Sequence, residues 1–145
     1  MPDILIATDA SSVYDDFHAV LAGSDTTVRW VRAGTAVLAS VNAHPPDLTI
    51  VDMQIGTMGG VAVALDLRLE QDAGRLERIP VLLVLDRRPD VFMARRSGVA
   101  GWIVKPLDPI RIRRAATALL AGDTWYDRSF IPDPVEVGPA SDSIP

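Results

Sequence analysis

Short apolar runs alternate with segments of helical periodicity along most of this chain. The runs that predict strands span residues 4–8, 26–31, 48–51, 81–85 and 99–104. Apolar residues recur at helical spacing after Ser11 or Ser12, where a serine can cap a helix, and in 35–43, 60–72, 89–97 and from 109 onward. Five strands that alternate with five helices predict an α/β fold with a parallel sheet and helices on both faces, because parallel neighbours require right-handed crossovers.

Local signals set several of the expected element ends. Pro45 stops the second helix, while Pro89 and Pro109 suit the first turns of the fourth and fifth. The continuous apolar run 81–85 predicts a central strand that is buried on both faces. In the third helix, the apolar residues at helical spacing are Val61, Ala64, Leu65 and Leu69.

Three ionisable side chains follow predicted strands: Asp9 the first, Asp52 the third and Lys105 the fifth. In a doubly wound sheet of order 2-1-3-4-5, strands one and three are neighbours, so Asp9 and Asp52 should face each other where ligands collect. Two close carboxylates repel unless a cation lies between them, and hard oxygen ligands favour Mg²⁺. Lys105, the only lysine among 14 basic residues, can balance further negative charge on Asp52.

A purely structural interpretation uses the same three residues. Asp9 can cap the first helix, and Asp52 can form a turn or a structural ion pair with Lys105. The strand-end pattern alone leaves both interpretations open.

Composition removes several classes of function. Without cysteine and with only two histidines, the chain is a poor candidate for a zinc site, a cysteine nucleophile or a Ser-His-Asp triad. No signal peptide and no apolar run of about 20 residues is present, so we expect a soluble cytoplasmic protein with no membrane association.

The net charge of -5 belongs mainly to the end of the chain. Residues 1–121 carry 14 acids and 13 bases, whereas 122–145 carry five acids and one arginine. Helical periodicity ends at Gly122 and prolines follow, so we expect one domain over 1–121 and an acidic, proline-containing tail over 122–145. Because Trp125, Tyr126 and Phe130 lie in this tail, it should dock either on its own domain or on a partner.

From residue 3 to about residue 121, the chain resembles the receiver domain of a two-component response regulator. The resemblance rests on Asp9, on Asp52 in Ile-Val-Asp, on Lys105 in Ile-Val-Lys-Pro and on Met-Gly-Gly at 58–60, which is similar to the family's Met-Asp-Gly. It implies a flavodoxin-like fold and a signalling domain in a phosphorelay. Because the sequence ends one tail after the fifth predicted helix, we expect this receiver to stand alone. Such a domain accepts a phosphoryl group and is not an enzyme beyond weak self-phosphorylation and dephosphorylation.

The resemblance also implies roles for individual residues. Asp52 would be the phosphoacceptor from a histidine kinase or phosphotransfer protein, and Lys105 the counter-ion of the phosphoryl group. Mg²⁺ would be held by Asp9, Asp52 and the backbone carbonyl of Gln54, and the Lys105-Pro106 bond would be cis. Positioning and charge stabilisation are what phosphoryl transfer needs most from a protein.

Four positions matter because they depart from the family pattern or lie at its switch. Thr8 replaces a second acid, which should weaken Mg²⁺ binding. Leu85 replaces the serine or threonine whose hydroxyl bonds the phosphoryl oxygen, and Asp86 adds negative charge where a small residue is usual. Trp102 takes the place of the aromatic residue that reports the switch, but it lacks a hydroxyl partner at residue 85. The alternative is therefore a pseudo-receiver that binds its partner without phosphorylation.

Arginines gather in the fourth and fifth helical segments: Arg87, Arg88, Arg95, Arg96, Arg111, Arg113 and Arg114. Such a patch could bind nucleic acid, but the neighbouring acids and the lack of a helix-turn-helix argue against it. By resemblance, this face would contact a downstream protein or a second copy in a homodimer. A further hypothesis, from charge complementarity, places the acidic tail across it.

Two other α/β families fit less well. The opening resembles that of universal stress proteins, but no glycine-rich phosphate loop follows Leu85. A flavin site needs a loop rich in Ser, Thr and Gly after the first strand, where Asp9 would repel a phosphate.

Overall fold

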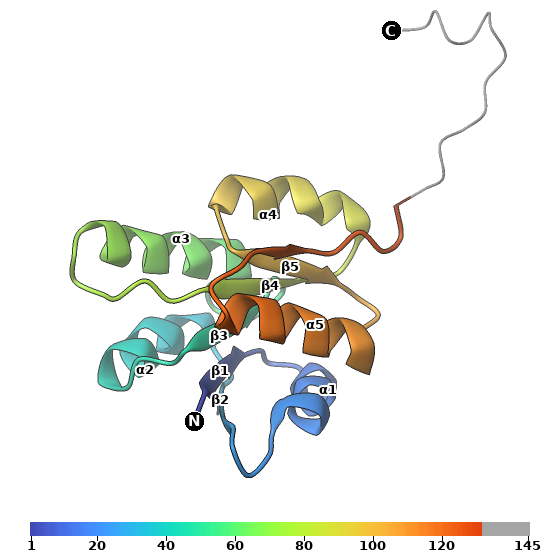
Figure 1. Cartoon of the computed structure of the whole chain (residues 1–145). Helices are drawn as coiled ribbons and strands as arrows, with labels where there is room; N and C mark the ends of the chain where they lie inside the picture. The colour runs from blue at the N-terminus through green and yellow to red at the C-terminus, as the bar shows by residue number, and fades with distance from the viewer. Residues whose placement is uncertain (132–145) are drawn as a thin grey trace, which may run out of the picture.

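The structure, a computed structural model, describes residues 1–131, which form one parallel sheet between two layers of helices (Figure 1). The strands run in the order β2-β1-β3-β4-β5-β6. Their bounds are β1 Asp3–Ala7, β2 Thr27–Val31, β3 Leu48–Asp52, β4 Val81–Leu85, β5 Gly101–Val104 and β6 Trp125–Tyr126. Because every pair is parallel, the carboxyl ends of β1, β3, β4 and β5 lie at one edge of the sheet.

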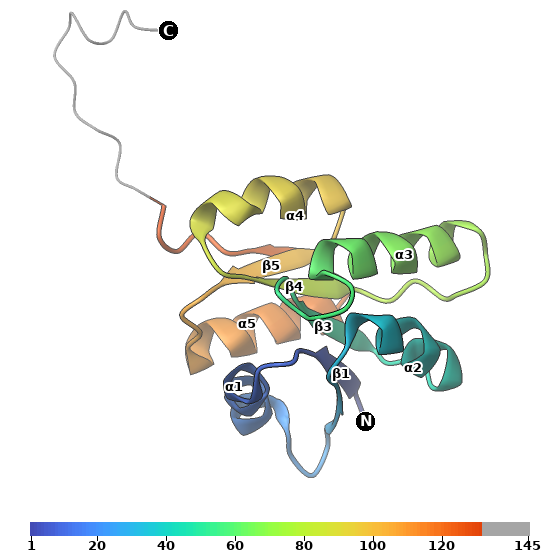
Figure 2. The ribbon, with the colours of Figure 1, turned by 180° about the vertical axis from the view of Figure 1, so that it is seen from behind.

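Helices cover both faces of the sheet, as Figures 1 and 2 show from opposite sides. One layer contains α1 (Ser11–Leu21) and α5 (Pro109–Leu120), and the other contains α2 (Val37–Ala43), α3 (Gly60–Asp72) and α4 (Val91–Ser97). Short 3₁₀ turns at Gly34–Ala36 and Arg88–Asp90 lead into α2 and α4. This doubly wound arrangement confirms the predicted fold class.

The core is divided by the sheet because successive strand residues point to opposite faces. On β4, Leu83 and Leu85 join the cluster under α2, α3 and α4, whereas Leu82 and Val84 join the cluster under α1 and α5. All of β4 is buried, which confirms 81–85 as a central strand. Within residues 1–131, no helix is both long and apolar enough to cross a lipid bilayer.

The sixth strand is the main difference from the predicted five-stranded sheet. The Trp125 N–H donates to the Ala100 carbonyl at 3.1 Å, and the Asp127 N–H donates to the Trp102 carbonyl at 3.1 Å. A strand of two residues is too short to show periodicity in the sequence. The segment after α5 therefore docks on its own domain, one of the two expected outcomes, and residues 132–145 of the predicted tail lie outside the described residues.

A buried carboxylate holds this segment in place. Asp127 is only 1% exposed, and its Oδ2 accepts hydrogen bonds from the Val104 N–H at 2.8 Å and from Arg111 Nη1 at 2.5 Å. The Tyr126 ring stacks on Trp102 with 4.3 Å between the ring centroids. The contacts with Val104 and Trp102 join the segment to β5, the strand that carries Lys105 at its end.

Two local patterns differ from the structure. Neither serine caps α1, whose N-cap is Ala10 without a side-chain hydrogen bond. In α3, Leu65 and Leu69 are 41% and 65% exposed, and the buried positions are Gly60, Val63, Ala64 and Leu67. Apolar residues lie on several sides of this helix, so its pattern alone did not identify the face that packs on the sheet.

The contact between β5 and β6 is close enough to test by substitution. A Cβ at Gly101 would lie 2.5 Å from the Trp125 carbonyl oxygen and 3.1 Å from Leu119 Cδ1. We expect Gly101→Ala to push β6 outward and to lower the free energy of unfolding by about 1–3 kcal/mol. Denaturant unfolding measures this, with Gly23→Ala as control because its Cβ would have 3.4 Å to the nearest atom, on a side chain. Equal stability of both variants would contradict close packing of β6.

Candidate functional site

The Asp52 side chain lies at the carboxyl end of β3 and is 2% exposed. Its Oδ2 accepts a hydrogen bond from the Thr8 hydroxyl at 2.8 Å. Its Oδ1 accepts the Gln54 backbone N–H at 3.2 Å and Lys105 Nζ at 3.3 Å. A buried charge needs such partners, and here they fix the orientation of the carboxylate.

Lys105 is shared between two carboxylates. Its Nζ donates to Asp86 Oδ1 at 2.8 Å as well as to Asp52 Oδ1 at 3.3 Å. Burial by itself would lower the pKa of the Lys105 ammonium, but the hydrogen bond to Asp86 and the charges of Asp52 and Asp86 outweigh it, so the pKa is raised. Lys105 is therefore a permanent cation at neutral pH, and the predicted cis Lys105-Pro106 bond is confirmed.

Asp9 lies at the same edge, but its carboxylate has a different partner. Its side chain is exposed, and its Oδ2 accepts the Gly56 N–H at 3.0 Å. Asp9 does not cap α1, which removes one part of the structural interpretation. It ties the end of β1 to the loop after β3.

The oxygen donors available for a metal are few. Within residues 1–131, no three acidic, histidine or cysteine side chains come together as a metal cluster. Mg²⁺ often needs only one or two carboxylates from a protein, and Asp9, Asp52 and the Gln54 carbonyl lie on neighbouring segments of this edge. Both Asp52 oxygens already accept hydrogen bonds from Thr8 and Lys105, so a metal would have to displace or share them.

Two of the positions expected to act as a switch, Leu85 and Trp102, are packed in the core, whereas Asp86 is 33% exposed. Leu85 is fully buried and belongs to the same cluster as Trp102, which is 3% exposed. A leucine side chain offers no hydrogen bond to a ligand at this edge. The Trp102 indole N–H has no acceptor among the described residues.

The sequence did not reveal the hydrogen-bond chain beneath Asp52. The sequence pattern shows Thr8 only as the replacement of a second acid, yet its buried hydroxyl orients Asp52 Oδ2, and its carbonyl accepts the Trp30 indole N–H at 2.8 Å. Trp30 in turn stacks on Tyr14, with ring centroids 4.1 Å apart. The one sign of this hydrogen-bond chain in the sequence is that Thr8 ends the first predicted strand and stands next to Asp9.

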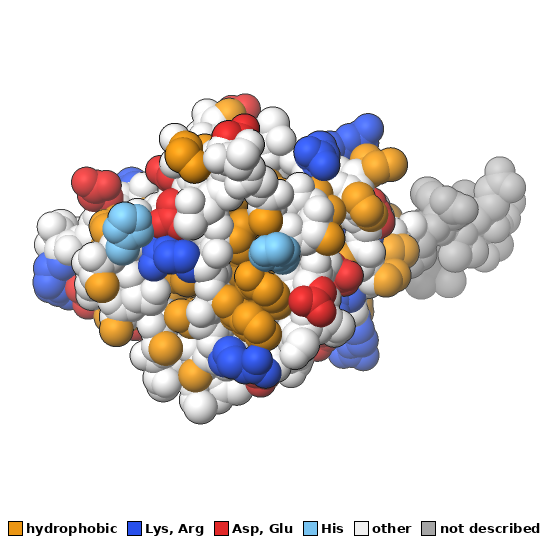
Figure 3. Space-filling view, turned by 90° about the horizontal axis from the view of Figure 1, so that it is seen from below, with side chains coloured by type: hydrophobic (Ala, Val, Ile, Leu, Met, Phe, Trp, Pro, Cys, Tyr) orange, Lys and Arg blue, Asp and Glu red, His pale blue; other side chains and the backbone are white. Residues whose placement is uncertain are grey.

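Charges of both signs are mixed over the surface seen in Figure 3, where hydrophobic side chains also gather near one histidine. No broad field of one sign occupies this face. This face lacks the clustered Lys and Arg of a phosphate-binding surface for nucleic acid, but α4, at the top of Figure 1, lies on the side away from this view.

In chemical terms, the edge presents one buried, oriented carboxylate beside one fixed cation. The carboxylate oxygen of Asp52 can act as a nucleophile toward an electrophilic group, and the Lys105 ammonium can stabilise negative charge that arrives with that group. Asp86 supplies negative charge of its own at the same place.

Comparison with sequence families points to one group. The model of the response regulator receiver domain matches residues 4–117. The DNA-binding response regulator MtrA of Mycobacterium tuberculosis is 29% identical over 108 residues, which cover 73% of this chain and 45% of that relative. An uncharacterized response regulatory protein of the same species is 32% identical over 97 residues, covering 66% of this chain and 69% of the relative. The chain thus spans less than half the length of MtrA.

Solved structures with the same fold include two receivers. The chemotaxis response regulator CheY4 of Vibrio cholerae matches with a TM-score of 0.73 and 20% identity, over 82% of this chain and 98% of that chain. The receiver domain of a signal transduction histidine kinase from Syntrophus aciditrophicus matches with a TM-score of 0.74 and 23% identity, over 94% and 98%. At these identities the likeness establishes the fold.

Proposed function

Since this chain belongs to the response regulator receiver family, we propose that it works in a phosphorelay in which Asp52 accepts the phosphoryl group. The donor would be the phosphohistidine of a histidine kinase or of a phosphotransfer protein. The observation that carries this proposal is the Asp52 carboxylate, buried at the carboxyl end of β3 and bonded to Lys105 at 3.3 Å.

The proposed transfer forms one bond and breaks one. A carboxylate oxygen of Asp52 attacks the phosphorus, the bond from phosphorus to the donor imidazole nitrogen breaks, and an acyl phosphate forms on Asp52. The electron pair of the broken bond leaves with the imidazole. Lys105 then exchanges its contact with the Asp52 carboxylate for a contact with a phosphoryl oxygen, because its ammonium is already at this edge.

A divalent cation such as Mg²⁺ would neutralise charge on the transferring group when bound. In this chain Asp9, Asp52 and the Gln54 carbonyl are the residues that would hold it. We propose weak binding, because Thr8 contributes a hydroxyl where a carboxylate would add charge, and because Lys105 already compensates Asp52.

We propose output through protein contacts, by way of the side of the molecule that carries α4 and α5. The curated relatives named DNA-binding are longer than this chain, and DNA binding is a property of those proteins. On α4, the apolar side chains of Phe92 and Met93 are 71% and 47% exposed, which suits contact with a protein partner or a second copy.

A direct test uses a small phosphodonor. The full chain is incubated with acetyl phosphate and Mg²⁺, and its intact mass is measured over time. The proposal predicts the gain of one phosphoryl group by the wild type and none by Asp52→Asn, which keeps the shape of the side chain. A gain by Asp52→Asn equal to that of the wild type would overturn the assignment of Asp52.

A second function is favoured by a specific observation. Asp52 is satisfied by Thr8 and Lys105, and Asp86 gives Lys105 a second anion, so the site has balanced partners without a phosphoryl group. A pseudo-receiver that binds its partner in this state would show no mass gain. Its affinity for that partner would be the same in the wild type and in Asp52→Asn.

Thr8→Asp tests the metal proposal. A second acid beside Asp52 should raise Mg²⁺ affinity by about tenfold and lower the stability of the metal-free protein, because two close carboxylates repel. Mg²⁺ titration followed by intrinsic tryptophan fluorescence measures the affinity, since Trp30, one of three tryptophans, bonds the Thr8 carbonyl. Thr8→Ser keeps the hydroxyl and is the control. Unchanged Mg²⁺ affinity in Thr8→Asp would contradict the proposed metal position.

A further inference from the structure

A cavity of about 420 Å³ lies between α4 and the segment that follows α5. Its wall includes Arg88, Arg95, Trp102, Tyr126, Asp127 and Arg128. Neither Asp52 nor Lys105 lines it, so it is separate from the proposed phosphoacceptor site. Its volume is within the range of sites that bind small molecules.

Positive charge predominates in the wall of this cavity. Its three guanidinium groups form no ion pair within residues 1–131. Arg88 donates to the backbone carbonyls of Asp127 and Ser129, and Arg95 lies over the Trp102 ring at 5.6 Å from its centroid. These partners are uncharged, so they leave the positive charges without compensation.

Within residues 1–131, the wall contains one carboxylate, Asp127, which already has hydrogen-bond partners. Asp127 is 1% exposed, and its Oδ2 accepts from Arg111 Nη1 at 2.5 Å and from the Val104 N–H at 2.8 Å. Its Oδ1 accepts the Ser129 N–H at 2.8 Å. Asp127 is therefore committed to the fold and does not neutralise Arg95 or Arg128.

A neutral hydrogen-bond donor lines the cavity together with the positively charged arginines. The Trp102 indole N–H is buried and has no acceptor among the described residues. A buried donor without an acceptor is destabilising, and Trp102 lines the cavity, so an oxyanion that reaches the indole N–H would relieve this cost. Guanidinium groups bind carboxylate and phosphate through paired hydrogen bonds, so an oxyanion satisfies both kinds of donor.

We propose that this cavity is an oxyanion site that binds a carboxylate or phosphate group through Arg95, Arg128 and the Trp102 indole. The anion has two possible sources with the same chemistry. One is a free anion in solution. The other is the chain itself, because Ile131 lines the cavity and the acids Asp133 and Glu136 follow closely in the sequence.

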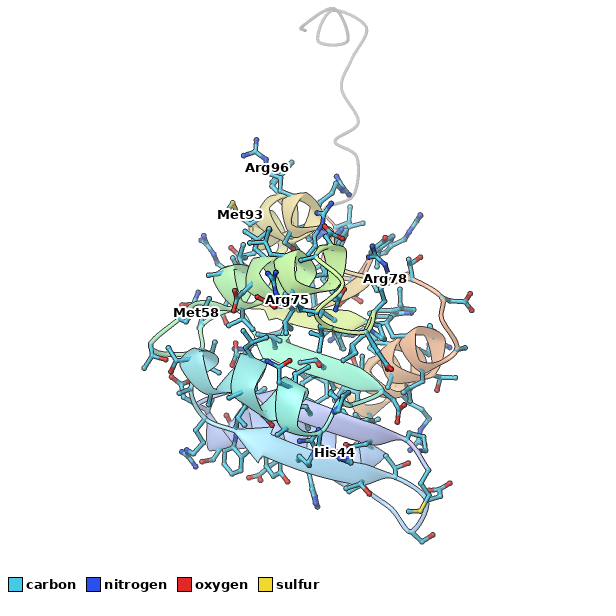
Figure 4. All side chains as sticks on the ribbon, turned by 90° about the vertical axis from the view of Figure 1, so that its left-hand side faces the viewer. His44, Met58, Arg75, Arg78, Met93 and Arg96 are labelled. Atoms are coloured by element: carbon cyan, nitrogen blue, oxygen red, sulfur yellow. The ribbon has the colours of Figure 1, made fainter. Side chains whose placement is uncertain are left out.

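The test uses inorganic phosphate as the probe and the full chain as the protein. The Trp102 indole N–H signal, assigned with Trp102→Phe, is followed by nuclear magnetic resonance during a phosphate titration. The inference predicts a saturable shift, with affinity at least tenfold weaker in Arg95→Gln. Arg96→Gln is the matched control, because it removes the same charge from the next residue of α4, whose side chain projects away from the body in Figure 4.

Two further variants identify the source and the location. In a variant that combines Asp133→Asn with Glu136→Gln, tighter phosphate binding would support the site and show that acids of the chain itself compete with phosphate. Unchanged phosphate binding would also support the site and show that the anion comes from solution. In Asp52→Asn the shift should persist, so failure of the phosphoacceptor proposal would leave this inference intact. No saturable shift, or equal weakening by Arg95→Gln and Arg96→Gln, would overturn the oxyanion site.

Discussion

Asp127→Ala should lower the free energy of unfolding by roughly 2–4 kcal/mol, although Asp127 lies after α5. The substitution removes one of the two carboxylates that pair with the Arg111 guanidinium, which keeps Asp108 at 2.5 Å, and it leaves the Val104 and Ser129 N–H groups without their acceptor. Donors that lose an acceptor in the interior are costly because water cannot replace it there. Equilibrium unfolding in urea, followed by far-ultraviolet circular dichroism, measures the loss.

Two controls make this result specific. Asp123→Ala removes an exposed acid from the same segment and should change stability by less than about 0.5 kcal/mol. Asp127→Asn keeps the size of the side chain and an acceptor for the Val104 N–H. Its loss of stability should therefore fall between those of Asp123→Ala and Asp127→Ala. A loss below about 1 kcal/mol for Asp127→Ala would show that the segment after α5 is not part of the folded domain.

Asp86→Ala should increase the rate of phosphorylation by acetyl phosphate about tenfold. Asp86 places negative charge 2.8 Å from Lys105 Nζ, at the edge where a phosphoryl group would arrive. The Coulomb repulsion between the Asp86 carboxylate and an incoming phosphoryl group is several kcal/mol at close range, and solvent screens it here because Asp86 is 33% exposed. Removal of Asp86 also leaves Lys105 free to follow the phosphoryl group.

Asp86→Asn separates charge from bulk, because it keeps the size of the side chain and removes its charge. If repulsion is the cause, Asp86→Asn should accelerate phosphorylation nearly as much as Asp86→Ala. Asp25→Ala, an exposed acid before β2 at the opposite edge of the sheet, should leave the rate unchanged. A slower rate in both Asp86 variants would mean that Asp86 assists the transfer by positioning Lys105.

Local patterns predicted the parts of this molecule that depend on neighbours in sequence. Each apolar run became a strand, and the parallel order brought Asp52 and Lys105, 53 residues apart, into contact at 3.3 Å. The βα order was sufficient because it determines which strand ends meet. Asp9 reached the same edge, although its partner there is the Gly56 N–H.

The remaining contacts depend on side-chain geometry that no periodicity records. Thr8 and Asp52 are 44 residues apart in sequence, and only the finished sheet brings the hydroxyl to 2.8 Å from the carboxylate. Asp127 lies in an acidic segment that is followed by prolines, a composition typical of a tail, and it becomes buried because Arg111 and the Val104 N–H offer it partners. Long-range polar pairing of this kind is decided by tertiary packing, which the linear pattern does not encode.

The central claim, that Asp52 carries the phosphoryl group, is tested most directly by chemical trapping. Borohydride reduces an acyl phosphate to an alcohol, so a phosphorylated aspartate becomes homoserine and releases phosphate. After treatment with acetyl phosphate and Mg²⁺, then borohydride, peptide mass analysis should find homoserine at position 52 and no change at Asp9 or Asp86. Homoserine at Asp9 or Asp86, or an unmodified Asp52 peptide in a sample whose intact mass showed phosphorylation, would contradict the assignment.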